Sequence, residues 1–373
     1  MSEARRRVVG ILIICLLVFA SGTWAQETAP AAETNGEPLL SRSVGTFPRI
    51  GSYEVLRGDF HIHTPHSDGK VPPRERILEA WRYDYDVIAI TDHGSYKAYA
   101  EALPLARSLG LLLVRGLETG IAGKEHYVVL GITDDYQPRD PHRWSEQPDG
   151  ETAYYRPQLR HVADSGGLAL YAHPHVGFRE PTEWGIAQGI IQGIEVKNAV
   201  VGSGWETIES HGTWCYPNAF DWALEHDLTI FANSDIHAPR RGDNQPVTLV
   251  LVGERSVQGV MDAIRARRTV AWFDGMLWGR EGLLTDLVQG MTRVRRTEDG
   301  SGSLQLRIAN HSPVALRATL QVEGDPRRIE VPPYSEALSE WTDLPELLSV
   351  RWDNVWINPR ENLVTRHNLR TGS

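Results

Sequence analysis

Short apolar runs alternate with amphipathic stretches along most of this chain, beginning near Val55. The first apolar runs span 55–63, 86–91 and 111–118, and stretches with helical spacing, 73–83 and 96–109, lie between them. This alternation is typical of repeated β-α units, in which helices cover a parallel sheet. The same pattern predicts strands at 126–132, 168–173, 190–197, 228–234 and 247–252, and helices at 156–165, 218–226 and 257–267. The sequence therefore predicts an α/β fold.

The pattern changes after about Phe273. Short runs that favour strands, 303–309, 315–322, 328–331 and 348–352, are separated by Gly, Pro, Asn and Asp, with no helical spacing between them. A length of 373 residues allows a second domain or an appendage on a barrel. We therefore expect an α/β domain over 46–275 and a small β-sandwich-like domain over 276–373.

The N-terminal residues are typical of an export signal. Residues 5–7 are three arginines, 8–20 form an apolar run, and 23–25 offer a small-residue cleavage site. An uncleaved anchor is the alternative, but the apolar run is shorter than the ~20 residues of a spanning helix. We expect a signal peptide over 1–25, a flexible linker over 26–45, and an exported, periplasmic or secreted protein without a stable membrane span after cleavage.

Composition narrows the class of partner. The formal net charge is −10 and the basic residues are scattered, which argues against a nucleic-acid-binding surface. A metal-lined pocket can be locally positive, so the net charge does not exclude a small anionic substrate. Cys215 is the one cysteine beyond the apolar run at the N-terminus, so no internal disulfide is expected after cleavage. The oligomeric state is not predicted.

Polar residues gather where the expected strands end, which is the edge at which barrel enzymes assemble their sites. His61 and His63 project from one face of the first strand, and the following turn can bring Asp68 back toward them. Later strand ends add Asp92, His93, Glu118, His126, His173, Asp235 and His237. Each alone is more often an ordinary hydrogen-bonded side chain. Imidazoles and carboxylates from nearly every strand together predict a metal centre.

These residues fall in ordered motifs that resemble a known family. The motifs are His61-x-His63 with Ser67-Asp68-Gly69, Thr91-Asp92-His93-Gly94, Gly116-Leu117-Glu118 with His126, Ala172-His173-Pro174, and Ser234-Asp235-x-His237. Together they look like the polymerase-and-histidinol-phosphatase (PHP) superfamily of metal-dependent phosphoesterases, over about residues 55–275. Residues 263–271 resemble the end of the domain in an exported, carbaryl-hydrolase-like branch. The resemblance implies a distorted (β/α)7 barrel with two or three metal ions at the C-terminal ends of its strands.

The resemblance also implies how the ligands divide. One metal would be held by His61, His63, Glu118 and Asp235, a second by Glu118, His126 and His173, and a third by Asp68, His93 and His237. A carboxylate shared by two cations offsets their repulsion. A mixed imidazole and carboxylate set suits Mn, Fe or Zn better than Ca or Mg. Some family members have a histidine at the position of Asp68.

Five more residues are candidates for contacting substrate or transferring a proton: Arg240, Arg241, Lys197, His66 and His175. The arginines offer a phosphate clamp and the lysine an anion contact, while a solvated loop or a structural role is the alternative. The two histidines flank ligand positions, so each could give a proton to a leaving group or support a ligand. Asp92 is expected to orient a ligand or cap a helix rather than bind metal.

The resemblance predicts a metal-dependent hydrolase, most directly a phosphoesterase of small monoesters or diesters, in which a metal-bridging hydroxide attacks phosphorus. A hydrolase of carboxylic esters, amides or carbamates is the first alternative, since the same nucleophile attacks carbon. A non-catalytic metal-containing protein, whose sandwich docks onto a polysaccharide or another partner, is the second. No Gly-rich phosphate loop, Gly-x-Ser-x-Gly elbow or Cys-x-x-Cys pair points to other chemistry.

Overall fold

A computed structural model describes residues 45–120, 125–133, 155–199, 208–210 (backbone only), 212–242, 245–298, 303–322, 324 and 326–369. The expected signal peptide and nearly all of the expected linker lie outside these ranges. The chain divides into Met1–Ser41 and Arg42–Ser373, and the fold described below belongs to the second unit. Among the described residues, no helix combines the length and the apolar character that a membrane crossing requires.

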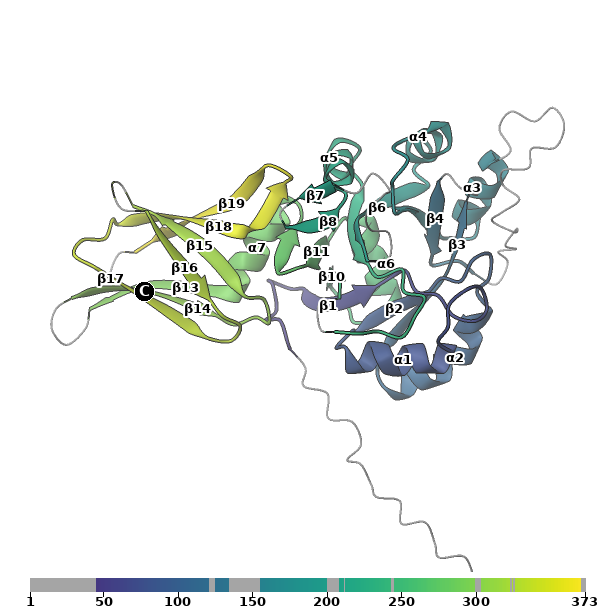
Figure 1. Cartoon of the computed structure of the whole chain (residues 1–373), viewed down its shortest axis with the longest axis horizontal. Coiled ribbons are helices and arrows are strands. Elements are labelled where there is room, and N and C mark those ends of the chain that lie inside the picture. The colour runs from purple at the N-terminus through teal and green to yellow at the C-terminus, as the bar shows by residue number, and fades with distance from the viewer. Residues whose placement is uncertain are drawn as a thin grey trace, which may run out of the picture. The chain divides into compact units, whose positions relative to one another are not determined.

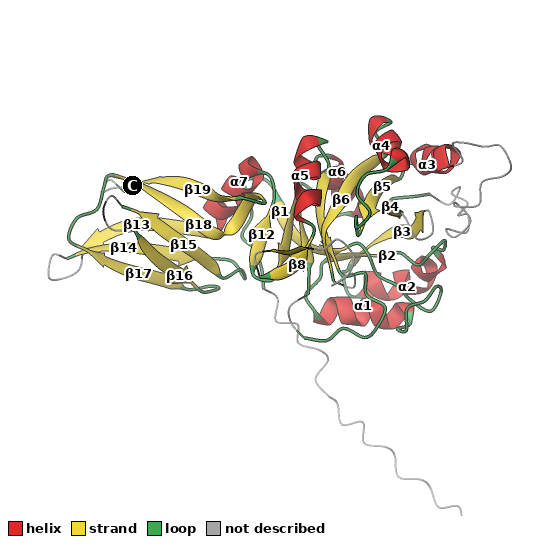
Figure 2. Ribbon diagram, turned by 45° about the horizontal axis from the view of Figure 1, so that its top comes forward, coloured by secondary structure: helices red, strands yellow, loops and turns green. Residues whose placement is uncertain are grey.

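Strands and helices alternate through the first part of this unit (Figure 1). In chain order they are β1 (Glu54–Asp59), α1 (Pro73–Arg82), β2 (Val87–Ile90), α2 (Lys97–Ser108), β3 (Leu112–Gly120), β4 (His126–Leu130), α3 (Tyr155–Asp164), β5 (Leu168–Ala172), α4 (Glu180–Ala187), β6 (Ile191–Asn198), β7 (Ile208–Ser210), β8 (Thr213–Cys215), α5 (Pro217–Glu225), β9 (Thr229–Asn233), β10 (Val247–Val252), α6 (Val257–Arg265) and β11 (Thr269–Phe273). Prolines at the first or second position favour the starts of α1, α4 and α5. Helices α1 and α2 pack side by side (Figure 2).

Nine of these strands follow one another in one large sheet, in the order β11-β10-β1-β2-β3-β4-β5-β6-β9, whereas β7 and β8 pair with each other. Strands β1, β2 and β3 are parallel, as are β5, β6 and β9. Strand β4 is antiparallel to β3 and β5, and β10 is antiparallel to β1. The α/β class is therefore confirmed, but the expectation of a parallel sheet is wrong in part. The link from Gly120 to His126 is too short for the crossover that parallel strands require.

The sheet curls so that β9, at the end of the pairing order, lies against β10. Thr248 Oγ1 of β10 accepts from Ala232 N and donates to Ala232 O, each at 2.9 Å. Side chains from seven strands fill the interior: Leu56, Val87, Val114, Val128, Leu170, Phe231 and Val250. Side chains rather than a continuous backbone ladder bring β9 to β10, so the closed (β/α)7 barrel stays a prediction.

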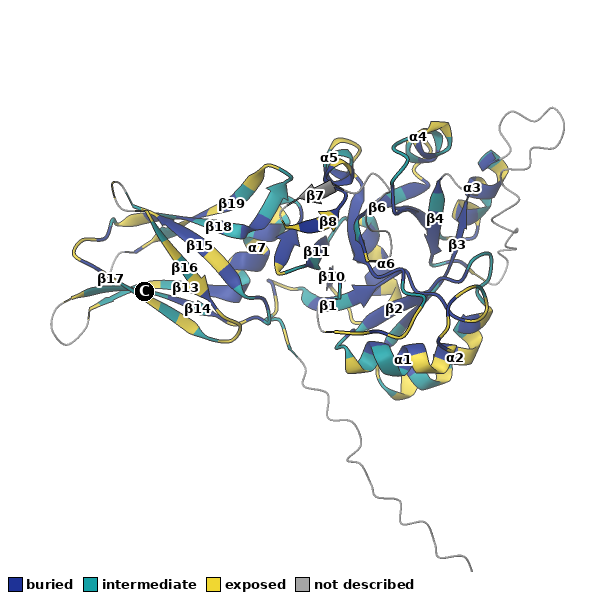
Figure 3. Cartoon of the chain, in the orientation of Figure 1, coloured by how far each residue is buried: buried dark blue, intermediate teal, exposed yellow. Residues whose placement is uncertain are grey.

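The remaining elements are β12 (Met276–Trp278), α7 (Glu281–Met291), β13 (Thr292–Glu298), β14 (Leu304–Asn310), β15 (Leu316–Gln321), β16 (Arg327–Val331), β17 (Glu336–Trp341), β18 (Leu347–Asn358) and β19 (Glu361–Asn368). Strands β12, β18, β15 and β16 continue the large sheet beyond β11, and β19 beside β18 brings it to 14 strands. Strands β13, β14 and β17 form a separate sheet, and Leu306 of β14 and Leu320 of β15 belong to one buried cluster. Strands β13, β16 and β17 of the C-terminal part carry exposed residues, whereas β2, β5, β9 and β10 of the α/β part are buried along their whole length (Figure 3).

Candidate metal centre

The polar residues predicted from the sequence lie at one edge of the curled sheet. His61 follows β1, His173 follows β5, and Asp235 follows β9, while Glu118 lies within β3. His126 is the first residue of its strand, as in the predicted strand 126–132, and in this it differs from the candidates that lie at the ends of strands. Since β4 runs antiparallel to β3, with His126 opposite Gly120, the start of β4 meets the same edge.

Glu118 is the centre of this cluster. Its carboxylate is 1% exposed and faces five imidazole rings. Oε1 lies 3.0 Å from His126 Nδ1 and 3.1 Å from His173 Nε2. Oε2 lies 3.2 Å from His61 Nε2, 3.3 Å from His63 Nε2 and 3.1 Å from His93 Nδ1. One carboxylate thus links two sets of histidines through its two oxygens.

The candidate ligand atoms form three groups, with all atoms of a group within 4.8 Å of one another. The groups are His61, His63, Glu118 and Asp235; Glu118, His126 and His173; and His63, Asp68, His93 and His237. This is the division that the family resemblance implies, with His63 added to the third group because its Nδ1 lies 3.5 Å from Asp68 Oδ1.

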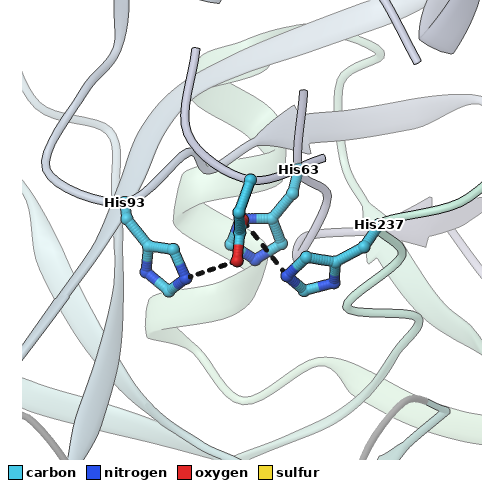
Figure 4. Close-up of side chains that lie close together, drawn as sticks. His63, His93 and His237 are labelled. Carbon is cyan, nitrogen blue, oxygen red and sulfur yellow. Dashed lines mark ion pairs between the residues drawn. The ribbon is translucent and has the colours of Figure 1, made fainter. Parts of the chain in front are cut away.

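The third group of candidate ligands, which contains Asp68, lies on the side of the site that solvent reaches. His93 and His237 face one another across a carboxylate (Figure 4), and Asp68 lies 3.6 Å from His93 Nε2 and 3.3 Å from His237 Nε2. The Asp68 side chain is 54% exposed, whereas those of His61 and His63 are 0% exposed. Solvent and small molecules therefore reach the cluster from the side of Asp68.

The donor atoms fit divalent cations. Asp235 Oδ1 lies 3.2 Å from His61 Nε2 and 3.0 Å from His63 Nε2. Both nitrogens are buried, yet neither meets the geometry of a hydrogen bond with any described residue. Buried polar atoms without a partner are rare in proteins and need an explanation. Lone pairs of nitrogen and oxygen that converge on one point are what Mn, Fe or Zn requires.

The histidines and carboxylates of the cluster shift one another's pKa values. Burial alone lowers the pKa of His61, but the carboxylates of Asp235, Glu118 and Glu195 raise it well above the usual value. Burial likewise lowers the pKa of His63, but the nearby carboxylates of Asp235 and Glu118 outweigh burial and raise this pKa to about 9. The pKa values of Glu118 and Asp235 are lowered despite burial, because the imidazoles favour the ionised carboxylates. The carboxylates are therefore ionised, and a cation that binds here displaces protons from His61 and His63.

A buried carboxylate that sequence reasoning missed supports the cluster from behind. Glu195 of β6 is 0% exposed, and its Oε1 accepts from His61 Nδ1 at 2.9 Å. This bond puts the His61 proton on Nδ1 and leaves Nε2 to face Glu118 and Asp235. The Glu195 side chain also accepts from His173 N at 2.7 Å. In the sequence, the one indication of this role is that Glu195 lies near the end of the predicted strand 190–197.

Two residues of the cluster have a left-handed backbone. His173 has φ 29° and Asp235 has φ 50°, a region that residues other than glycine seldom adopt. Hydrogen bonds hold both of them, since Glu195 accepts from His173 N and Asn198 Nδ2 donates to Asp235 Oδ2 at 3.1 Å. Strained backbone that the surroundings fix in this way is typical of functional sites.

Asp92 holds the turn between His63 and Asp68 through three hydrogen bonds. Its Oδ1 accepts from Thr64 N at 2.6 Å and from Ser67 Oγ at 2.8 Å, and its Oδ2 accepts from Thr64 Oγ1 at 2.6 Å. Because Asp92 follows β2, these hydrogen bonds attach the turn that carries Asp68 to the end of that strand.

Two of the residues proposed to contact substrate, Arg240 and Lys197, form contacts with other residues of the chain. Arg240 is buried, and its Nη2 donates to Asp59 Oδ2 at 2.5 Å, so the predicted phosphate clamp is wrong for this residue. A buried carboxylate requires a counter-charge, and Arg240 supplies it. Lys197 Nζ donates to Thr213 Oγ1 at 2.9 Å and pairs with Asp274 at 3.2 Å. These contacts occupy the ammonium group, and its predicted contact with an anion stays a prediction.

The other three candidates differ in position. His66 Nε2 lies 3.1 Å from Glu101 Oε2 of α2, which directs the ring toward that helix. His175 stacks on His173, with ring centroids 5.6 Å apart, and its Nδ1 donates to His173 O at 2.7 Å. His175 therefore adjoins the cluster. Arg241 is exposed, and its contact with a phosphate stays a prediction.

Comparison with known proteins agrees with the motifs. Residues 59–179 match the model of the PHP domain. The PolC-type DNA polymerase III of Thermotoga maritima is 26% identical over 142 residues, which are 36% of this chain and 10% of that protein. An uncharacterized protein of Methanocaldococcus jannaschii is 24% identical over 155 residues, 39% of this chain and 82% of that protein. The chain thus spans only a small part of the polymerase.

A solved structure is similar over nearly the whole chain. It is a two-domain protein from Bacteroides vulgatus containing a predicted PHP-like metal-dependent phosphoesterase. The TM-score is 0.74 at 24% sequence identity, and the match covers 88% of this chain and 99% of that one. At this identity the likeness concerns the fold alone.

Proposed function

We propose that this chain, which carries a PHP domain, is a metal-dependent hydrolase of small phosphate esters. The observation that carries the proposal is Glu118, a buried carboxylate that faces His61 and His63 through one oxygen and His126 and His173 through the other. Such a bridge offsets the repulsion between two neighbouring cations. Two-ion centres of this kind are suited to displacement at phosphorus.

The three groups of donor atoms would hold two or three divalent ions, with Mn, Fe or Zn favoured by the mixture of imidazole and carboxylate. Bound ions would lower the pKa of water from 15.7 to about 7 and withdraw charge from the phosphoryl oxygens. The exposed Asp68 marks the side from which a substrate enters, because the His61 and His63 side chains are closed to solvent.

The protein's own residues then have distinct tasks. Glu195 fixes the tautomer of His61, and the bond from His175 Nδ1 to His173 O fixes the His175 ring beside the cluster. A half-buried imidazole in this position can give a proton to a departing alkoxide. We propose His175 for this role in preference to His66, which pairs with Glu101.

The test combines metal analysis with a panel of esters. Purified protein should hydrolyse bis-p-nitrophenyl phosphate or p-nitrophenyl phosphate, lose activity with a chelator, and regain it with Mn²⁺, Fe²⁺ or Zn²⁺. Asp235→Asn should lower both metal content and kcat, the latter by about 100-fold or more, since it removes a donor that faces two histidines. Glu225→Gln, at an exposed position of α5, is the matched control.

The outcomes separate the proposal from its rivals. A folded Asp235→Asn variant with full metal content and activity would overturn the assignment of the site. Activity on p-nitrophenyl acetate without activity on either phosphate would favour the carboxylic ester alternative, and metal-loaded protein without any turnover would favour a binding protein. We also propose export, as residues 1–25 predict, and cell fractionation tests it.

A further inference from the structure

Strand β18 divides between two neighbours. Residues 349–352 pair with β15, whereas Val355 and Trp356 pair with β12. The register between β18 and β19 also shifts between Trp352 and Trp356. Irregularities of this kind bend a strand and redirect its side chains. The sheet therefore forks where β18 leaves β15.

Asn354 fixes the geometry of this fork. It is 1% exposed, and its Oδ1 accepts from Arg317 N at 2.9 Å. Its Nδ2 donates to Gly275 O at 2.6 Å and to Ala315 O at 2.9 Å. One buried amide thus satisfies the backbone groups that the divided strand leaves unpaired. Hydrogen bonds from Asn354 to Gly275 on one side and to Ala315 and Arg317 on the other therefore fix the fork in the sheet.

A hollow of about 540 Å³ lies at the fork, within the range of volumes that hold small ligands. Strands β15, β16, β18 and β19 contribute to its lining. The lining residues used below are Arg317, Arg328, Arg351, Glu330, Asp353 and Trp356. Five of these six residues are charged and the sixth is aromatic, so the hollow offers both polar and apolar contacts.

The arginines make the hollow favourable for an anion. Arg351 is fixed by Asp353 Oδ1, 2.8 Å from its Nε. Arg317 and Arg328 are exposed, and neither forms an ion pair with any described residue. Three guanidinium groups face two carboxylates here, although the whole chain carries a net charge of −10. Guanidinium groups bind carboxylates and phosphates through paired hydrogen bonds.

The other lining groups define the rest of the ligand. Trp356 is partly buried against the core, so its ring is held in place and offers an apolar surface. The exposed carboxylate of Glu330 accepts hydrogen bonds only and can bind hydroxyl groups of a ligand, whereas Asp353 already accepts from Arg351 Nε and Thr319 Oγ1. A ring with an apolar face, several hydroxyl groups and a negative charge meets all three requirements.

We propose that the hollow at the β18 fork binds an acidic saccharide, with its carboxylates on Arg317 and Arg328 and a sugar ring against Trp356. None of these residues belongs to the Glu118 cluster. Binding therefore does not depend on hydrolysis, and the proposal can fail or hold independently of the proposed function. Such a site would retain the hydrolase on an acidic polysaccharide.

Calorimetry with the full chain tests this proposal. The probes are trisaccharides of galacturonate, mannuronate and glucuronate, and the comparison ligands are a neutral galactose trisaccharide and inorganic phosphate. At least one acidic trisaccharide should bind, and the binding should weaken as salt increases. Arg317→Ala and Arg328→Ala should each weaken it about tenfold or more, the usual scale for a hydrogen bond to a charged group.

Arg295→Ala is the matched control, because Arg295 is exposed on β13 of the opposite sheet and does not line the hollow. It should leave binding unchanged, and all three variants should keep wild-type melting temperatures and wild-type phosphatase activity. Failure of every acidic trisaccharide to bind folded protein would overturn the proposal. Equal affinity for the neutral trisaccharide, or wild-type affinity of both Arg317→Ala and Arg328→Ala, would do the same.

Discussion

Replacing Glu195 by Gln tests whether a carboxylate behind the cluster governs cation binding. Its Oε1 accepts from His61 Nδ1 and Asn233 Nδ2, each at 2.9 Å. Its Oε2 accepts from His173 N at 2.7 Å and Asn198 Nδ2 at 2.9 Å. Glutamine has the same shape, but an NH₂ group replaces one oxygen. Whichever oxygen becomes the NH₂ group, the two hydrogen-bond donors that this oxygen bound then face another donor. One of these two donors belongs to His61 or His173.

The size of the effect follows from these bonds. A hydrogen bond to a charged group contributes roughly 1.5–3 kcal/mol, so the loss of two lowers the free energy of unfolding by about 3–6 kcal/mol. A domain with a stability of about 10 kcal/mol, in the middle of the usual range, keeps about 4–7 kcal/mol after this loss and remains folded. Removal of the partner behind a ligating histidine lowers metal affinity by roughly 10- to 100-fold. The pKa of Glu195 is lowered by His61 despite burial, so wild-type Glu195 is ionised at neutral pH.

The assay is equilibrium dialysis against Mn²⁺ or Zn²⁺ with metal quantification, together with thermal unfolding in chelator and in saturating metal. Glu195→Gln should require about 10- to 100-fold more free metal for half-saturation and should melt at a lower temperature in chelator. Glu225→Gln should behave as wild type, since Glu225 is exposed. Wild-type affinity and melting temperature in a folded Glu195→Gln protein would refute the role of this carboxylate.

Three further measurements test other contacts of the fold. Arg240→Ala leaves Asp59 buried without its partner, so the free energy of unfolding measured with urea should fall by about 3–5 kcal/mol; an unchanged value would contradict the pairing. In chelator-treated protein, stabilisation by His63 should be complete below pH 6.5 and lost as the pH rises through about 9, because its folded pKa is raised; urea midpoints that rise over this range would contradict it. Burial raises the pKa of Cys215 to about 12, so a thiol-specific reagent at pH 8 should modify it only after unfolding, and prompt reaction with native protein would argue against this environment.

The sequence predicted the cluster because its members follow buried strands, and strand order brings their ends to one edge. It did not predict the directions of side chains in the loops beyond. Arg240 lies three residues after His237, yet it turns inward to Asp59, 181 residues away in the chain. Lys197 likewise turns to Asp274. Contacts across such distances depend on the folded sheet, which residue spacing alone does not determine.

Two helices, α4 and α7, and the buried residue Glu195 were not predicted from the sequence. Helix α4 has eight residues and a weakly amphipathic pattern, so its spacing gave little signal. Helix α7 buries Leu284, Leu287, Val288 and Met291, a helical spacing that the general shift toward short strands after Phe273 concealed. Glu195 belongs to no motif, because its role depends on neighbours from three other parts of the chain.

The same network explains how carboxylates and strained residues can be held together before any cation binds. The left-handed backbone at His173 and Asp235 costs of order 1–3 kcal/mol each, and the hydrogen bonds of Glu195 and Asn198 offset that cost. The raised pKa of His61 places a proton among the carboxylates, which limits their mutual repulsion. A cation then meets preorganised donors and must displace protons rather than rearrange the chain. Metal affinity should therefore rise with pH, because each imidazole that binds must first lose its proton.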